Sequence, residues 1–257
     1  METLSVIRLG WPISNVWLLP RTEIGPVLID SGMSLLWPLI ERGLERHGFS
    51  PRDLGAVLLT HLHSDHAGNA ARLSSRFDVP VYAHPADGDV LGGRSPRIGM
   101  PVDGLGVEAV FCRIENRFPA RRLQTRPLNE GDEVAGMEVY SMPGHTKGSV
   151  FLYHRRSGTL FTGDTLLNGT PPLITRTRLC LPHPPFCWNH ELAIESLRRF
   201  VELDVDVQTL CSGHGPKRSG ALRPAVERLL DAELRNRRHL HSHTGTMPEA
   251  QPASIGL

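Results

Sequence analysis

The stretch Thr60-His61-Leu62-His63-Ser64-Asp65-His66 places three imidazoles and one carboxylate within six positions, directly after an apolar run at residues 56–59. Such a run predicts a buried strand, and the small residues at 67–71 can open a helix, so the cluster follows the carboxyl end of a strand. Open αβ architectures place ligand sites at that end, and imidazole nitrogens with a carboxylate oxygen are ligands that zinc prefers. The stretch therefore predicts a metal site.

Three more residues able to bind metal follow other apolar strands. They are His145 in the glycine-flanked loop at 143–148, Asp164 after the run at 160–163, and His214 in the stretch 210–216, again after an apolar strand. Each alone could be an ordinary loop residue. With 13 histidines in 257 residues, however, His-x-His-x-Asp-His arises by chance in roughly 0.0015 of such chains. Four strand ends that supply His and Asp in this order form a specific pattern.

Two other strand ends carry weaker signals. Asp30 ends a strand at 28–32, where its carboxylate could orient an imidazole by accepting the proton of the second ring nitrogen. The alternative, that Asp30 only begins a turn with the following Ser-Gly pair, stays open. His84 follows a strand at 79–83, and with the next residue, a proline, it favours the start of a helix over a ligand.

Together, Asp30, the 61–66 cluster, His145, Asp164 and His214 resemble the metal motifs of the metallo-β-lactamase superfamily, over about residues 6–216. The sequences at 143–146 and 161–165 are similar to those of the glyoxalase II-like branch, although the glutathione-binding carboxyl-terminal domain of that enzyme is not evident. The resemblance implies an α+β fold, a four-layer αββα sandwich of two mixed β-sheets flanked by helices.

The resemblance also implies which residues bind each of two metal ions. One metal would be held by His61, His63 and His145, a second by Asp65, His66 and His214, with Asp164 bridging the two and Asp30 supporting the metal loop from behind. The expected cofactors are two zinc ions, with manganese and iron as alternatives. Retention of a histidine at position 63, where the oxygen-binding di-iron branch has glutamate, favours hydrolysis. True β-lactamases usually lack the bridging aspartate, which is present here as Asp164. Antibiotic hydrolysis is therefore not expected to be the main role.

The function that we predict is a binuclear metal-dependent hydrolase acting on a carboxylic ester, thioester or lactone. Zinc lowers the pKa of a bound water to roughly 7, so a metal-bridging hydroxide can act as nucleophile. Asp65 and Asp164 would be the catalytic carboxylates, Asp65 handing a proton to the leaving group. Two alternatives remain: a mononuclear iron persulfide dioxygenase using His61, His145 and Asp164, and a non-catalytic metal-containing small-molecule sensor.

Two irregular segments flank these motifs and are expected to set substrate identity. Residues 92–127, rich in glycine and proline, predict an inserted loop or lid, and Arg117, Arg121 and Arg122 within it could contact an anionic acyl thioester. A solvated basic surface is the alternative. Residues 168–190 could form a substrate wall with His190. Another interpretation of this segment is a separate zinc knuckle made by Cys180, His183, Cys187 and His190.

The composition of the chain limits the binding partners and the cell compartment that we expect. Lys and Arg number 28 against 27 Asp and Glu, which gives no global electrostatic case for nucleic acid or an anionic membrane, so a small-molecule substrate is expected. No apolar run approaches the roughly 18 to 20 residues of a membrane span, and residues 1–20 have no leader pattern. Four sparse cysteines agree with a reducing compartment, so we expect a cytoplasmic protein. The oligomeric state is left open.

Periodicity predicts how the chain is divided. We expect one domain at residues 1–238 and a disordered polar tail at 239–257. The expected strands are at 4–9, 15–19, 26–30, 56–59, 79–83, 136–141, 149–154 and 159–162, and the expected helices at 34–47, 69–76, 191–201 and 221 to about 238.

Overall fold

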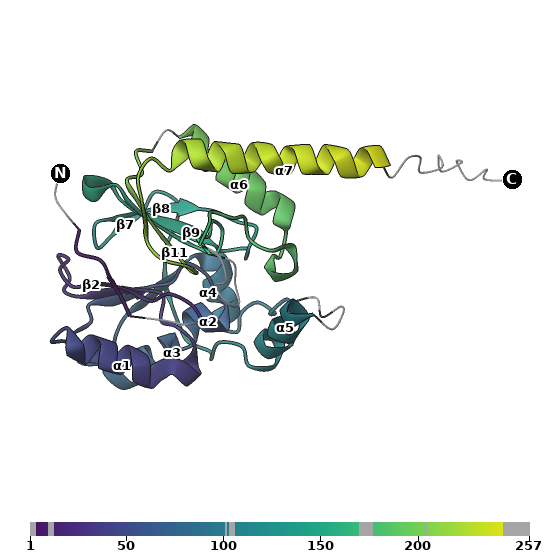
Figure 1. The fold of residues 1–257 in the computed structure, drawn as a ribbon. Helices are drawn as coiled ribbons and strands as arrows, with labels where there is room; N and C mark the ends of the chain where they lie inside the picture. The colour runs from purple at the N-terminus through teal and green to yellow at the C-terminus, as the bar shows by residue number, and fades with distance from the viewer. Residues whose placement is uncertain are drawn as a thin grey trace, which may run out of the picture.

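Two six-stranded sheets pack face to face with helices on both outer faces (Figure 1). This computed structural model describes residues 4–9, 13–100, 102, 106–169, 177–203 and 205–243. The arrangement is the four-layer αββα sandwich that the sequence predicted, and that prediction is confirmed. None of the helices in these ranges is long and apolar enough to cross a membrane.

The first sheet changes from antiparallel to parallel pairing along its width. Pairs β1–β2 and β2–β3 are antiparallel, whereas β3–β4, β4–β5 and β5–β6 are parallel. Parallel neighbours need crossover connections, which here contain the helices of the outer layer. The strands are β1 (Ile7–Arg8), β2 (Trp17–Leu19), β3 (Val27–Ile29), β4 (Ala56–Leu58), β5 (Val81–Ala83) and β6 (Arg126–Pro127), and the helices are α1 (Trp37–Arg46), α2 (Ser64–Ala67), α3 (Ala70–Phe77) and α4 (Pro85–Leu91).

The second sheet has the order β12-β11-β10-β9-β8-β7, and only β10 and β11 in it run parallel. Figure 1 shows α6 and α7 above this sheet, with α1 and α3 below the first. The strands are β7 (Glu133–Val134), β8 (Met137–Ser141), β9 (Val150–His154), β10 (Thr159–Gly163), β11 (Thr209–Ser212) and β12 (Arg218–Ser219), and the helices are α6 (His190–Glu202) and α7 (Arg223–His243).

The apolar core has three parts because each central strand is buried on both faces. In β3, Leu28 packs toward the first helix layer, whereas Val27 and Ile29 face the second sheet. The same layer between the sheets includes Leu58 and Phe161, and burial of side chains of this size contributes roughly 1.5–3 kcal/mol each. A third cluster lies between the second sheet and helices α6 and α7. Strands buried on both faces explain why the sequence showed continuous apolar runs rather than alternation.

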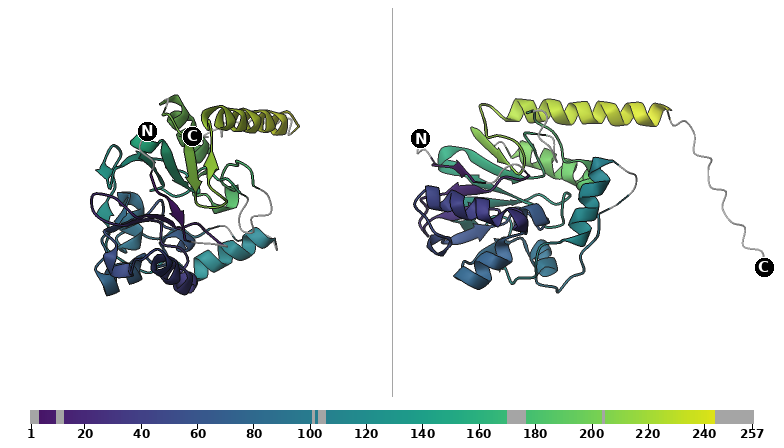
Figure 2. Two further views of the ribbon diagram at one scale, coloured as in Figure 1. Left: turned by 60° about the vertical axis from the view of Figure 1, so that its left-hand side comes forward. Right: turned by 60° about the horizontal axis from the view of Figure 1, so that its bottom comes forward.

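Three expectations differ from the observed elements. The helix expected at 34–47 is a short 3₁₀ turn at 34–36 followed by α1. The segment 92–127, expected to be irregular, contains α5 (Val107–Arg117), which Figures 1 and 2 show at one end of the sandwich. The last helix continues to His243, five residues into the expected tail. The extension is explained by helix propagation, because adding residues to an existing helix costs much less than starting one. Residues 244–257 lie outside the described residues.

Candidate metal centre

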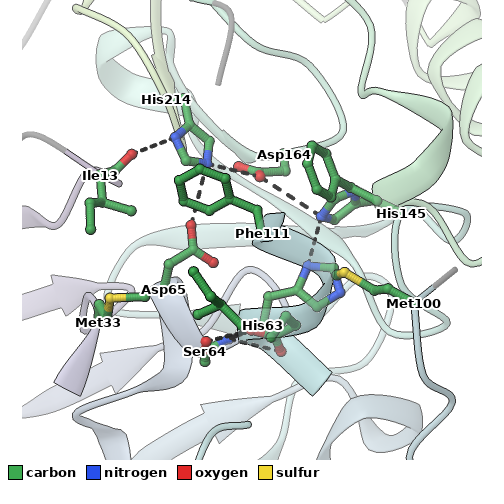
Figure 3. Close-up of a pocket in the computed structure, with 13 residues that line it drawn as sticks. Ile13, Met33, His63, Ser64, Asp65, Met100, Phe111, His145, Asp164 and His214 are labelled. Atoms are coloured by element: carbon green, nitrogen blue, oxygen red, sulfur yellow. Dashed lines mark hydrogen bonds and ion pairs between the residues drawn. The ribbon is translucent and has the colours of Figure 1, made fainter. Parts of the chain in front are cut away.

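The predicted ligands converge because their strands end at one edge of the sandwich. Strand β9 is antiparallel to both β8 and β10, and β10 is parallel to β11, so the carboxyl ends of β8, β10 and β11 share an edge. His145, Asp164 and His214 follow these three ends, and the 61–66 cluster follows β4 in the facing sheet. Figure 3 shows His63, Asp65, His145, Asp164 and His214 pointing toward one another.

All seven predicted ligands belong to groups whose nitrogen and oxygen atoms lie within 4.8 Å of one another. The described residues form three such groups: His61 with His63 and His145, His61 with His66 and Asp164, and Asp65 with His66 and His214. Neighbouring groups share a residue, so the donor atoms form one continuous cluster rather than separate sites. This arrangement suits two adjacent cations.

Asp164 occupies the middle of the cluster. Its Oδ1 is 3.3 Å from His66 Nε2, and its Oδ2 is 3.1 Å from His214 Nε2 and 3.8 Å from His145 Nε2. Asp164 therefore lies next to His145 of one group and next to His66 and His214 of another. Gly213 permits this placement, because a Cβ at that position would overlap Asp164 Oδ1.

Several inward polar atoms lack a hydrogen bond within the protein, although His66 Nε2 and Asp164 Oδ1 lie 3.3 Å apart as an ion pair. His61 Nε2, His66 Nε2 and Asp164 Oδ1 are buried, and none accepts or donates a hydrogen bond. A buried polar atom without a partner costs roughly 1–3 kcal/mol, so several of them at one point are unfavourable in a protein that binds nothing there. Imidazole nitrogens and a carboxylate oxygen are also the donors that zinc and iron accept. The residues present therefore fit a metal pair.

Asp30 holds the metal loop from behind. Its Oδ2 accepts the His66 Nδ1 proton at 2.8 Å, and its Oδ1 accepts the backbone N–H of Thr60 at 2.8 Å. The first contact is the hydrogen bond that the sequence suggested, and it directs His66 Nε2 into the cluster. Asp30 has a φ of 61°, in the left-handed region that non-glycine residues rarely adopt. The backbone strain at Asp30 is therefore offset by these contacts.

Other imidazoles are oriented in the same way, with one nitrogen inward and the other held by the protein. His214 Nδ1 donates to the carbonyl of Ile13 at 2.6 Å, and His145 Nδ1 lies 3.7 Å from Cys187 Sγ. His63 is reversed, because its Nδ1 is the inward atom, 3.0 Å from His145 Nε2. Fixed ring orientations of this kind raise the affinity of a site for metal.

Electrostatics divides the histidines into two sets. Burial lowers the pKa of His61 and His63 well below the usual value and that of His145 to about 4, so these three rings are neutral at pH 7. Burial opposes the charge on His66 and His214 too, but the adjacent carboxylates outweigh it. They raise the pKa of His66 well above its usual value and that of His214 to about 10.

The two carboxylates of the cluster remain ionised. Burial alone would raise the pKa of Asp65 and of Asp164, but His66 and His214 outweigh burial and hold both pKa values well below the usual range. At neutral pH the metal-free centre therefore holds two negative carboxylates and two protonated imidazoles. Metal binding would displace those protons, because a ligating imidazole must be neutral.

Asp87 is a buried carboxyl that the sequence analysis missed. It lies in α4 and joins the two metal loops, since its Oδ2 accepts from Thr146 Oγ1 at 2.7 Å, its Oδ1 accepts from Gly148 N at 2.8 Å, and Leu62 donates through its backbone. Burial raises the pKa of Asp87 to about 6 despite these bonds. In the sequence, Asp87 looked like an ordinary acidic residue in the first turn of a helix. The ring of His84 caps that helix, α4, as expected.

Glu115 is the second residue that the sequence analysis missed. It projects from α5, accepts the backbone N–H of Ser64 at 3.0 Å and the Ser64 hydroxyl, and forms an ion pair with Arg97. Burial raises the pKa of Glu115. Ser64 lies between the predicted ligands His63 and Asp65. Helix α5 of the segment 92–127 is therefore hydrogen-bonded directly to the loop that carries these ligands. Nothing in the sequence indicated this role for Glu115, because a charged residue is not expected on the buried face of a helix.

A pocket of about 560 Å³ opens beside the cluster and is apolar apart from Ser64, Glu115 and the predicted ligands. Figure 3 shows Met33, Met100 and Phe111 around it. Its apolar lining consists of Ile13, Met33, Met100, Phe111, Ile114 and Phe186. The lid segment thus supplies part of the wall through α5 and Met100.

The substrate contacts expected from sequence do not reach this pocket. Arg117 lies over the ring of Phe118 at 5.2 Å, at the exposed end of α5, and neither Arg121, Arg122 nor His190 lines the pocket. The helix in 92–127 directs Arg117 outward, and Arg121 and Arg122 are exposed in the segment after it, which the sequence alone could not show. Arg97 from the same segment is the arginine that approaches the ligands.

The four residues of the alternative zinc knuckle do not come together as one group. His183 Nδ1 pairs with Glu108 at 2.5 Å, whereas Cys187 approaches His145 and Cys180 lies near the carbonyl of Gly169. Among the described residues, no group able to bind metal includes any of Cys180, His183, Cys187 or His190.

We predict that Asp87→Asn weakens metal affinity about 10- to 100-fold, because the amide would present N–H groups to donors that now bind a carboxylate. Chelator competition with zinc measures this affinity. Asp89→Asn is the matched control, since Asp89 lies in the same helix and pairs on the surface with Arg94 at 2.8 Å. Equal affinities of Asp87→Asn and the unmodified protein would show that this bridge does not support the loops.

We also predict that metal loading at pH 7 releases protons from His66 and His214, in addition to the proton lost when a metal-bound water becomes hydroxide, since the adjacent carboxylates raise the pKa of His66 well above its usual value and that of His214 to about 10. Because protons compete with metal at these rings, affinity should rise as pH rises. Calorimetric titration with zinc in buffers of different ionisation enthalpy measures the release. A heat independent of the buffer would mean that neither ring gives up a proton.

Comparison with solved structures supports the same architecture. TTHA1429 from Thermus thermophilus, a metallo-beta-lactamase family protein, superposes with a TM-score of 0.67 at 22% identity, covering 95% of this chain and 83% of that one. The structure of TTHA1623 in a di-iron-bound form gives a TM-score of 0.60 at 28% identity and covers 84% of this chain and 94% of that one.

Sequence comparison gives the family. A probable metallo-hydrolase of Bacillus subtilis (strain 168), YybB, is 30% identical over 62% of this chain and 64% of its own length, so the match spans slightly less than two thirds of that relative. A second from the same strain, YflN, is 26% identical over 81% of this chain and 83% of its length. The metallo-beta-lactamase superfamily model matches residues 9–214, and the chain belongs to that superfamily.

Proposed function

We propose that the protein is a binuclear metal-dependent hydrolase of a carboxylic ester, thioester or lactone. The observation that carries this proposal is the continuous cluster of seven inward ligands with Asp164 between its groups. Membership of the superfamily and the likeness to relatives named as probable metallo-hydrolases support it. In the described residues we find no other constellation of this kind beside a pocket.

In this proposal, His61, His63 and His145 hold one ion, and Asp65, His66 and His214 hold the other. Asp164 is shared, consistent with its position next to His145 of the first set, at 3.8 Å, and next to His66 and His214 of the second, at 3.3 and 3.1 Å. When bound, a pair of zinc ions supplies a hydroxide nucleophile at neutral pH and polarises the substrate carbonyl. The neutral state of His61, His63 and His145 leaves their inward nitrogens free to bind without prior loss of a proton.

Asp65 is placed to move a proton. Its Oδ2 lies 3.4 Å from both His66 Nε2 and His214 Nε2, its side chain is 22% exposed, and it lines the pocket. A carboxylate beside a pocket can collect a proton as the tetrahedral intermediate forms and give it to the departing oxygen or sulfur. In our proposal the leaving group therefore occupies the apolar pocket, and its atoms next to the scissile bond are uncharged.

The native metal is part of the proposal. We favour zinc on the strength of the imidazole-rich donor set, and the di-iron form of TTHA1623 makes iron the first alternative. A persulfide dioxygenase with a single iron at His61, His145 and Asp164 would use the same pocket. Thiol-dependent oxygen uptake by the iron-loaded protein would favour that reaction, and its absence would remove it.

The proposed function predicts about two metal ions per chain after zinc loading, together with hydrolysis of members of a panel of thioesters, esters and lactones. Metal analysis and a spectrophotometric screen are the measurements, with the chelated protein as control. A protein that holds well under two ions and gains no hydrolytic activity from zinc, manganese or iron would rule out this function.

We further predict that Asp164→Ala lowers metal content more than loss of any single histidine, because two nearby cations without a shared anion repel each other. By contrast, Asp30→Asn should weaken metal affinity only about 10- to 100-fold, since asparagine tolerates the left-handed backbone and keeps one acceptor. Metal analysis of the two variants tests both statements. Retention of two ions by Asp164→Ala would refute the bridging role.

A further inference from the structure

A second pocket, of about 1210 Å³, is also lined by His63 and His145 and extends away from Asp65 over Leu62, Lys147 and Trp188. Four residues line both pockets: His63, His145, Met100 and Phe186. The second pocket does not include Asp65 or His214. The two spaces therefore adjoin at one half of the proposed metal pair, and a substrate bound there can extend into both.

The two pockets differ in charge. The first has no lysine or arginine in its lining, whereas the second has Arg97 and Lys147. Lys147 is exposed, lies two residues after His145, and its Nζ sits 5.0 Å from the centre of the Trp188 ring, which also lines the pocket. A cation–π contact of this kind restrains a flexible ammonium without neutralising it.

The carboxylates near this pocket are engaged elsewhere. Glu115 pairs with Arg97, and Asp87 accepts hydrogen bonds from Thr146 and Gly148. No salt bridge joins Lys147 to a carboxylate in the ranges that the structure describes. Lys147 is therefore the positive group of this pocket whose charge remains available to a ligand.

We propose that the second pocket binds the acyl portion of the substrate and that Lys147 recognises an anionic group, a carboxylate, at the far end of that acyl portion. The substrate class is then an ester or thioester of a dicarboxylic acid, or a lactone that carries a carboxylate at a distance from its ring carbonyl. This inference rests on the proposed function for its orientation, because the leaving group was assigned to the space beside Asp65. The acyl chain must leave the scissile carbonyl on the opposite side, past His63 and His145.

In this proposal Lys147, rather than the arginines expected from the sequence, binds the anionic group of the substrate. An anionic substrate was expected to meet Arg117, Arg121 and Arg122, none of which lines either pocket. The positive charge lies instead on the loop that carries His145. Because Lys147 and His145 share this short loop, the distance between the reacting carbonyl and the distal anion is set by rigid structure rather than by the lid.

A binding experiment tests the subsite without relying on turnover. The zinc-loaded protein is titrated calorimetrically with hexanedioate and with hexanoate, which both offer one carboxylate to the metal centre and differ in the second. We expect hexanedioate to bind about 5- to 10-fold more tightly, as for a partly sheltered charged pair, and this advantage to vanish in Lys147→Gln. Equal affinities in the unmodified protein would overturn the proposal, whether or not the protein is a hydrolase.

A kinetic experiment tests the same site during turnover. The substrates are the S-phenyl monothioester of hexanedioic acid and its uncharged analogue with a methylamide at the far carboxyl. The ratio of their kcat/KM values should fall about 5- to 10-fold in Lys147→Gln through the KM of the charged substrate, and it should fall as salt is added. Arg117→Gln, a surface change outside both pockets, should leave the ratio unchanged. Equal loss for both substrates would refute recognition by Lys147 and leave the hydrolase function intact.

Discussion

The constraint on which the structure depends is the burial of imidazoles and carboxylates at one edge of an apolar sandwich. His61, His66 and Asp164 present polar atoms that no hydrogen bond satisfies, and such groups are tolerated only where something else binds them. The two sheets bring the strand ends together, and the layer behind them fixes each ring. Asp30, Ile13 and Asp87 belong to that layer.

The segment 92–127, which we call the lid, is attached to the metal-binding loop and forms part of the walls of both pockets. Helix α5 is tied to the metal loop by the contact of Glu115 with Ser64, so the apolar wall formed by Phe111 and Ile114 is held in register with the ligands. The same lid contributes Arg97 to the neighbouring pocket. The metal loops thus determine which reaction can occur, whereas the lid and the loop at Lys147 determine which molecules fit.

Much of this could be predicted from the sequence where a local pattern carried the information. Apolar runs that ended in His or Asp located β4, β8, β10 and β11 together with the ligands that follow them, because strand ends and ligand types are read from neighbouring residues. Helix α5 could not be predicted, since Glu115 occupies its buried face while Val107 and Val110 are exposed, so its apolar residues do not mark one face. Asp87 was missed for a related reason: its partners Thr146 and Gly148 are about sixty residues away. The outward direction of Arg117 likewise depends on a helix that the sequence did not reveal.

The central claim is that two cations occupy this cluster and share Asp164. Crystallographic anomalous scattering at the zinc absorption edge, measured on zinc-loaded protein, tests it most directly. The account predicts two peaks about 3.5–4 Å apart, with the Asp164 carboxylate contacting both. A single peak held by one group of ligands, or two peaks with Asp164 bound to only one, would contradict it.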